Sequence, residues 1–301
     1  MDKKEQVPGV NTILHSEGYL LILITYAIGF SLVKYLGGDL DLVSLVLGAV
    51  LCLLVLVMQQ FLHAYFDHPD SLISTLKSDD PEFTLLKRFK RSVLLQYALL
   101  ALSAGAALTL VLVTLKAVTL PVLVFIGVAL VLSFFTAVPP FRLEKQGYGE
   151  LIETLFVTIL VPAIGFSLQQ QGIPRFLVYL TLPVAFVYLA MKIVYSFPRY
   201  AADIALGRKT LVTQLGWQNA LVLHNLLVLG AFILIGLFTV FGYPWSFTRG
   251  LLLALPIGAL QIYLMIRLGE GDRPRWAMLY WGAAGLFLVI CYMEIVTLWL
   301  K

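Results

Sequence analysis

Charged residues are scarce in this chain. Only 13% of its 301 residues are Asp, Glu, Lys or Arg, whereas 60% are hydrophobic. Soluble domains need far more charge on their surfaces, so this composition excludes a pair of soluble domains. Cysteine is also rare. Cys52 and Cys291 are the two cysteines and lack CxxC spacing, which argues against a disulfide framework or a cysteine metal site. We expect both to be small buried apolar residues.

The chain instead contains long apolar runs. Nine of them have about 20 residues, the length that a helix needs to cross a membrane. The sequence therefore predicts an all-α integral membrane protein with nine transmembrane helices and a single polytopic domain over residues 1–301. The predicted spans are 18–37, 43–66, 92–114, 117–138, 150–168, 175–196, 219–241, 247–267 and 276–299.

Lysine and arginine are distributed unevenly between the segments that join these spans. If the N-terminus is cytoplasmic, 16 of the 21 fall on the cytoplasmic side, and the other five are Lys34, Lys116, Arg175, Arg249 and Lys301. Because positive residues accumulate in the cytoplasm, we predict a cytoplasmic tail (1–17), cytoplasmic motif loops (67–91 and 197–218) and an external C-terminus. The expected location is a bacterial or archaeal plasma membrane.

The excess of basic over acidic residues does not indicate a nucleic-acid partner. The net charge is +4, and both the topology and contact with anionic membrane lipid account for it. No apolar region with a cleavage site precedes the first span, so we expect the first helix to act as the insertion signal.

Three polar stretches interrupt the apolar runs on the predicted cytoplasmic side. They read QQFLHAYFDHPDS at 59–71, PPFRLEKQGYGELIETLF at 139–156 and SFPRYAADIALGRKTLVTQLG at 196–216. Residues four apart share one face of a helix, so His63 lies with Asp67. Arg199 lies with Asp203 in the same way if the sixth span continues through them. We expect these positions to converge on one cytoplasm-facing site.

Taken together, the stretches resemble the signature segments of the UbiA superfamily of intramembrane prenyltransferases, most closely its dihydroxynaphthoate (menaquinone-pathway) branch. Asp67 and Asp203 match motif aspartates, but His63 replaces an asparagine. Ser71 and Arg199 stand where the family has further aspartates, so the acidic motifs are degenerate. The resemblance implies a UbiA-like bundle around a central cavity that opens to lipid.

Prenyl transfer ionises an allylic carbon–oxygen bond, so the diphosphate must be stabilised while water is excluded. The resemblance implies catalytic roles for Asp67, Asp203 and Arg199, and Mg²⁺ held by Asp67, Asp203 and Asp70. It implies a prenyl diphosphate and an aromatic or other lipophilic acceptor, as in quinone biosynthesis. The residues expected to contact the diphosphate are Lys192, Arg208, Lys209, Arg142, Lys145, Tyr200 and His63.

Other interpretations stay open. A catalytically degenerate protein that binds isoprenoid or quinone lipids would explain the missing aspartates, and a terpene cyclase would use the same ionisation. A transporter is a third class, although the spans show no inverted repeat. Single residues also have plainer roles: Lys192 snorkels to the interface, Glu150 and Glu153 favour a helix N-terminus, and Glu294 lies near the outer interface.

Overall fold

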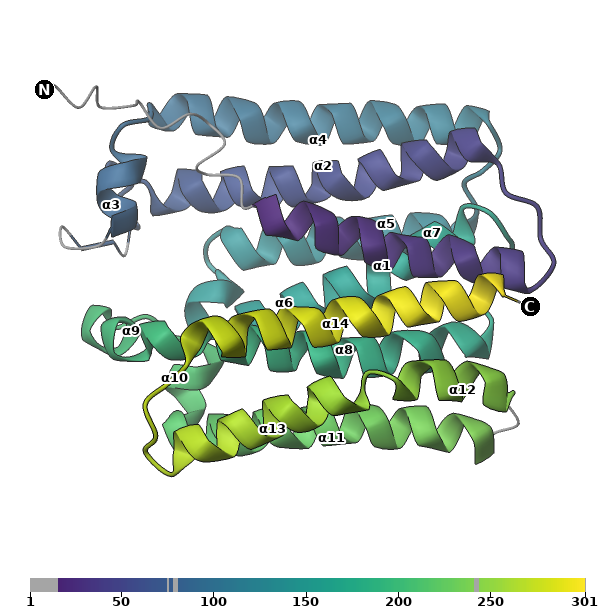
Figure 1. Cartoon of the computed structure of the whole chain (residues 1–301). Coiled ribbons are helices and arrows are strands. Elements are labelled where there is room, and N and C mark those ends of the chain that lie inside the picture. The colour runs from purple at the N-terminus through teal and green to yellow at the C-terminus, as the bar shows by residue number, and fades with distance from the viewer. Residues whose placement is uncertain (1–15, 75, 78–80, 241–243, 301) are drawn as a thin grey trace, which may run out of the picture.

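The computed structural model describes residues 16–74, 76–77, 81–240 and 244–300, and each regular element in these ranges is a helix (Figure 1). Eight helical segments of the described chain are long and apolar enough to cross a membrane, which makes the protein an all-helical, multi-pass integral membrane protein. Seven are continuous helices: α1 (Ser16–Tyr35), α2 (Leu42–Asp67), α4 (Arg91–Thr114), α5 (Leu120–Ala137), α8 (Arg175–Ser196), α11 (Trp217–Val240) and α14 (Trp276–Trp299).

The predicted span at 150–168 is a composite of three helical pieces. It consists of α6 (Gly149–Leu155), the π-helical turn η3 (Phe156–Leu160) and α7 (Val161–Ser167). The N–H of Val161 bonds to the carbonyl of Phe156, five residues back. Pro162 follows directly and has no N–H to continue an α-helical pattern, which explains why the irregular turn lies here.

The predicted span at 247–267 is broken, so nine continuous spans are not confirmed. The chain forms α12 (Trp245–Leu252) and α13 (Leu255–Gly269) instead, with Pro256 in the first turn of α13. A proline ring clashes with the carbonyl four residues earlier, which favours a break before Leu255. Trp299 donates a hydrogen bond to Ser31 (Nε1–Oγ 2.9 Å), so α1 and α14 end on the same side. The return from α11 to α14 is made by α12 and α13 together (Figure 1).

Close backbone contacts hold the helices together. α2 packs along α4, α8 along α11, and α1 along α7. A Cβ on Gly29 of α1 would lie 2.1 Å from the carbonyl oxygen of Pro162, so only glycine permits this approach. Small residues at such crossings are typical of helix packing in membranes. Cys52 and Cys291 are buried free thiols, as predicted.

One end of the bundle carries all three polar stretches, and we call it the motif end. It comprises residues 67–74, 76–77 and 81–91, the connection 137–149, and residues 196–217. The predicted loop at 197–218 is largely helical, with η4 (Phe197–Arg199), α9 (Tyr200–Leu206) and α10 (Leu211–Leu215). A short helix, α3 (Pro81–Leu86), lies in the segment after α2, within the predicted loop 67–91. Figure 1 shows α3 and α9 at the same end.

Candidate functional site

Asp67, the last residue of α2, lies between two cations at the motif end. Its Oδ1 pairs with the guanidinium of Arg142, and its Oδ2 lies 2.7 Å from Nζ of Lys145. The side chain of Asp67 is only 9% exposed. Arg142 also donates from Nη1 to the carbonyl of Ile73 (2.7 Å). Three of the predicted site residues are therefore in direct contact, with each carboxylate oxygen facing a different cation.

The connection 137–149 is folded tightly enough to present two cations to α2. Arg142 has φ +40° and ψ +52°, a left-handed conformation that is costly for a residue with a Cβ. The ion pair with Asp67 and the bond to Ile73 help to offset that cost. Residues Leu143–Gln146 form the 3-10 turn η2, which ends at Gly147 with φ +88°. A Cβ there would also meet the side chain of Gln214 at 2.2 Å.

His63 joins the same network from the preceding turn of α2. Its Nδ1 lies 2.6 Å from Oε2 of Glu144, a residue of η2 that the sequence analysis did not place in the site. Partial burial acts to raise the pKa of the Glu144 carboxyl. The charge and hydrogen bond of His63, with the charges of Lys145 and Lys192, outweigh that effect and lower the pKa to about 2. Glu144 is therefore a carboxylate at neutral pH.

Lys192 is a third cation at this end of the bundle. Its Nζ lies 2.7 Å from Oε2 of Glu153, and Tyr188 donates to the other oxygen of that carboxylate (2.8 Å). Lys192 also interacts electrostatically with Glu150 and Glu144, which links it to the network around Asp67. An ionisable residue in a membrane helix needs a partner, and Tyr188 lies one turn before Lys192 on the same face. That spacing is the sequence signal that could have identified Tyr188.

Glu150 ties the polar stretch 196–216, which we call the second motif, to the first turn of α6. Its Oε1 accepts a hydrogen bond from the backbone N–H of Leu211 (3.2 Å), the first residue of α10, and a longer one from Ser196 (3.5 Å). The sequence predicts a favourable position for Glu150 at the N-terminus of its own helix. In the structure its carboxylate also lies at the N-terminus of α10.

The second motif divides into buried and exposed positions. Asp203 is buried, whereas Arg199 and Lys209 are exposed, so Arg199 and Asp203 lie in different environments although they are four residues apart. Tyr200 packs its ring against Trp217, with centroids 5.5 Å apart. Neither Tyr200 nor Lys209 is brought to Asp67 by the contacts described above.

Two polar contacts hold the segment after α2 against the second motif. Lys77 donates to the carbonyl of Ala205 (3.0 Å), and Arg208 pairs with Glu82 of α3 (3.0 Å). The two motif segments therefore lie together at one end of the bundle, although more than 120 residues separate them. Convergence of the Asp67 and Asp203 carboxylates on one ligand stays a prediction.

The described residues do not fit a site for Mg²⁺. They contain no cluster of three or more His, Cys, Asp or Glu side chains that could hold a metal ion. Both oxygens of Asp67 already face cations. The side chain of Asp70 is 80% exposed, and its Oδ2 lies 3.5 Å from Nδ1 of His68. His68 in turn bonds through Nε2 to the carbonyl of Phe89 (2.8 Å) and accepts from the N–H of Asp70 (3.1 Å), which is a structural role.

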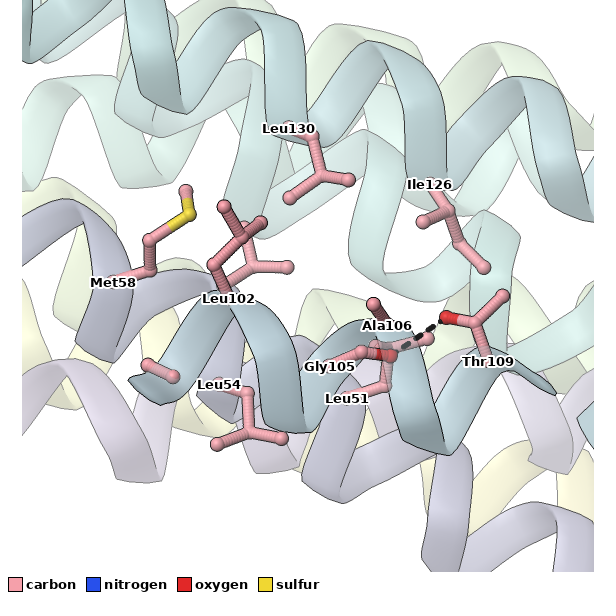
Figure 2. A pocket seen from close by; sticks show the side chains of 11 residues that line it. Leu51, Leu54, Met58, Leu102, Gly105, Ala106, Thr109, Ile126 and Leu130 are labelled. Atoms are coloured by element: carbon pink, nitrogen blue, oxygen red, sulfur yellow. Dashed lines mark hydrogen bonds between the residues drawn. The ribbon is translucent and has the colours of Figure 1, made fainter. Parts of the chain in front are cut away.

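The pocket in Figure 2 lies away from these charges, between α2, α4 and α5. It has a volume of about 60 Å³, and Leu51, Met58 and Ile126 are among its largely apolar lining residues. Thr109 uses its hydroxyl on the carbonyl of Gly105 (2.8 Å) and offers little polarity to a ligand. The predicted central cavity is not confirmed by this pocket.

Solved structures show which fold this helical arrangement belongs to. A UbiA homolog from Archaeoglobus fulgidus bound to DMAPP and Mg²⁺ matches with a TM-score of 0.60 at 15% identity, over 94% of this chain and 96% of its own. This chain has the UbiA fold. A UbiA homolog from the same organism bound to GPP and Mg²⁺ gives a TM-score of 0.60 at 18% identity, over 94% and 95% of the two chains.

A further structure of a UbiA homolog from Archaeoglobus fulgidus gives a TM-score of 0.59 at 15% identity, over 95% of this chain and 98% of that one. Comparison with models of protein families gives no match, and comparison with curated proteins gives none. At these identities the likeness establishes the fold, while the menaquinone branch stays a prediction.

Proposed function

We propose that this protein binds a prenyl diphosphate at the motif end and transfers the prenyl group to a lipophilic acceptor in the membrane. The observation that carries the proposal is the meeting of Arg142, Lys145 and Lys192 in one polar network at the end of an apolar bundle. Homologs with the same fold were solved with DMAPP or GPP bound, which supports a prenyl diphosphate as the substrate.

Such cations suit the leaving group of the reaction. When the allylic carbon–oxygen bond breaks, its electron pair stays on the diphosphate, and the negative charge on that group increases. Cations that are already positioned stabilise this charge more in the transition state than in the ground state. The acceptor then forms the new bond to the prenyl carbon and loses a proton. Arginine and lysine differ here, because the planar guanidinium can donate to two phosphate oxygens at once.

The predicted site residues take two kinds of role in the proposal. Arg142, Lys145, Lys192 and His63 would contact the diphosphate or hold its contacts in place. The residues of the second motif would approach it from the other side of the motif end; these are Arg199, Tyr200, Asp203, Arg208 and Lys209. An aromatic acceptor of quinone biosynthesis is the acceptor class that we propose, and internal cyclisation of the prenyl chain is the alternative outcome of the same ionisation.

A second function is favoured by a specific observation. Asp67 is saturated by two cations, and Ser71 and Arg199 provide no carboxylate. A protein that binds isoprenoid diphosphates or quinone lipids without ionising them would tolerate this arrangement.

Pyrophosphate release distinguishes the two functions. The purified protein in nanodiscs is incubated with Mg²⁺, a panel of prenyl diphosphates and an aromatic acceptor, and released pyrophosphate is measured. Release that falls at least about tenfold in Lys192→Met supports transfer, since one charge-assisted contact to a leaving group contributes about 2 kcal/mol or more. Lys34→Met is the matched control, because Lys34 is an exposed lysine at the other end of the bundle. Binding without any release would favour the second function.

A further inference from the structure

We infer that the motif end binds the diphosphate without a divalent metal ion, with Arg142 and Lys145 in the place that Mg²⁺ would occupy. The inference rests on the proposed function, because it concerns the same site and the same ligand. It departs from the UbiA homologs of the same fold, two of which were solved with Mg²⁺.

The first support is the occupancy of Asp67. Mg²⁺ requires oxygen ligands at about 2.1 Å in an octahedral arrangement. The Nζ of Lys145 already lies 2.7 Å from Oδ2, and the guanidinium of Arg142 takes Oδ1. A divalent cation at this carboxylate would have to displace both positive groups or lie beside them. Like charges at such distances repel strongly, since the three side chains are largely withdrawn from water.

The second support is the anchoring of the two cations. Arg142 is held by Ile73 as well as by Asp67, and its left-handed backbone fixes the direction of its side chain. A metal that displaced Arg142 would leave a largely buried guanidinium, 12% exposed, without its carboxylate. Leaving such a charge unpaired is unfavourable. The pairing therefore resists exchange for a metal.

The third support is the donor capacity that remains for an anion. In the contacts described, Arg142 donates to Asp67 and Ile73 and Lys145 donates to Asp67. A guanidinium has five N–H groups and an ammonium has three, so both residues keep donors for phosphate oxygens. Asp67 neutralises only one of the two positive charges. The three side chains together keep one positive charge, and the nearby carboxylate of Glu144 is paired with His63, so the positive charge favours an anion over Mg²⁺.

The second motif has the same tendency. Arg199 stands at the position of a family aspartate. The backbone N–H of Arg208 donates to the carbonyl of Asp203 (2.8 Å), and Lys77 donates to the carbonyl of Ala205, two residues after Asp203. Ser71 therefore removes a carboxylate from the first motif, and Arg199 replaces one with a cation in the second, so both substitutions reduce the number of carboxylates that could hold a metal.

A binding titration with and without metal tests the inference. The probe is the thiolo analogue of geranyl diphosphate, which resists ionisation, and its Kd for the protein in nanodiscs is measured in excess EDTA and in saturating Mg²⁺. We expect the two values to agree within about threefold. Binding that requires Mg²⁺ would refute the metal-free site and leave the proposed function standing. No binding under either condition would refute the proposed function itself.

Variants at Lys145 assign the effect to the named cations. In EDTA, Lys145→Met should weaken binding by about tenfold or more, the effect expected for losing a charge-assisted contact, while Lys145→Arg should retain most of the affinity. Lys34→Met should bind like the wild type. Thermal unfolding of each variant is measured in parallel. A Lys145→Arg variant that is folded and yet binds no better than Lys145→Met would contradict a charge-based role.

Discussion

Replacing Asp67 with asparagine should separate the stability of the motif end from its affinity for diphosphate. The substitution keeps the shape of the side chain and removes its charge. Arg142 and Lys145, which are 12% and 23% exposed, then lose their shared counter-ion. Removing one member of a buried ion pair costs about 3–5 kcal/mol. Because Lys145 is partly hydrated and the amide oxygen still accepts one hydrogen bond, we expect a loss of about 2 kcal/mol.

The affinity should change in the opposite direction. In the wild type the carboxylate of Asp67 competes with phosphate oxygens for the same two cations. Asp67→Asn removes the competitor, so binding of the geranyl thiolo analogue in EDTA should strengthen by about three- to tenfold, or roughly 0.7–1.4 kcal/mol. Thermal unfolding followed by tryptophan fluorescence reports the stability, and the EDTA titration reports the affinity.

The matched control is Asp39→Asn, which removes the charge of an exposed aspartate between α1 and α2, at the other end of the bundle. It should change neither quantity. A metal-ligand role for Asp67 predicts a different pattern, with affinity in Mg²⁺ falling sharply and stability little affected. An Asp67→Asn variant that is stable and has lost Mg²⁺-dependent binding would refute our account of this residue.

Three further predictions follow from single residues. The pKa of Glu144 is lowered to about 2 in the folded protein. The contribution of this carboxylate to stability is therefore complete above the pKa of the unfolded state, near 4.5, and is lost as the pH falls toward 2. The difference in unfolding temperature between wild type and Glu144→Gln should shrink over that pH range. Because Glu144 is 47% exposed, the corresponding difference in unfolding free energy should be less than about 1 kcal/mol. A difference in unfolding temperature that grows on acidification would contradict the ion pair with His63. Glu294 is fully buried in α14, and neither carboxylate oxygen has a hydrogen-bond partner among the described residues, so Glu294→Met should raise stability by about 1–3 kcal/mol in thermal unfolding; a destabilised variant would indicate an interaction that burial alone does not reveal. Cysteines placed at the exposed positions Asp70 and Ala205 should both react with a membrane-impermeant maleimide from the cytoplasmic face, and labelling of either from outside would overturn the predicted topology.

The positions of the spans could be predicted from the sequence because each apolar run is bounded by polar residues. The prediction for 43–66 differs from α2 by one residue at each end, and that for 276–299 coincides with α14. Proline was harder to interpret. Pro256 accompanies the break between α12 and α13, whereas Pro183 lies inside the continuous helix α8. Pro183 is buried, and the neighbours that pack against it cannot be inferred from a single sequence.

The same limit applies to burial. Glu294 was expected near the outer interface because it lies two turns from the end of its span, yet it is fully buried against neighbouring helices. Distance along a helix gives the depth of a residue in the membrane. The face of the helix that it occupies decides whether it meets lipid, water or protein, and that depends on neighbours remote in sequence.

Charge pairing at the motif end was also outside the reach of sequence reasoning. His63 and Asp67 were predicted to share a face, and both do contribute to the same network. Their partners, however, are Glu144, Arg142 and Lys145, which lie at least 75 residues away along the chain. Nothing in the spacing of residues 139–156 shows which cation will meet which carboxylate. The fold decides it, through the tight turn at Arg142.

The lost aspartates and the pairing of Asp67 are consistent with a single electrostatic requirement. A Mg²⁺ site for a diphosphate needs one or two carboxylates whose oxygens can reach the metal, together with oxygens of the phosphates. With Ser71 and Arg199 at two of those positions, a metal would gain too few ligands to offset the nearby cations. Asp67 is then stabilised by Arg142 and Lys145 instead, and the site loses its affinity for Mg²⁺ while it keeps donors for phosphate. Because the exchange involves only side chains at the motif end, the bundle can keep the UbiA fold while the way it holds its ligand changes.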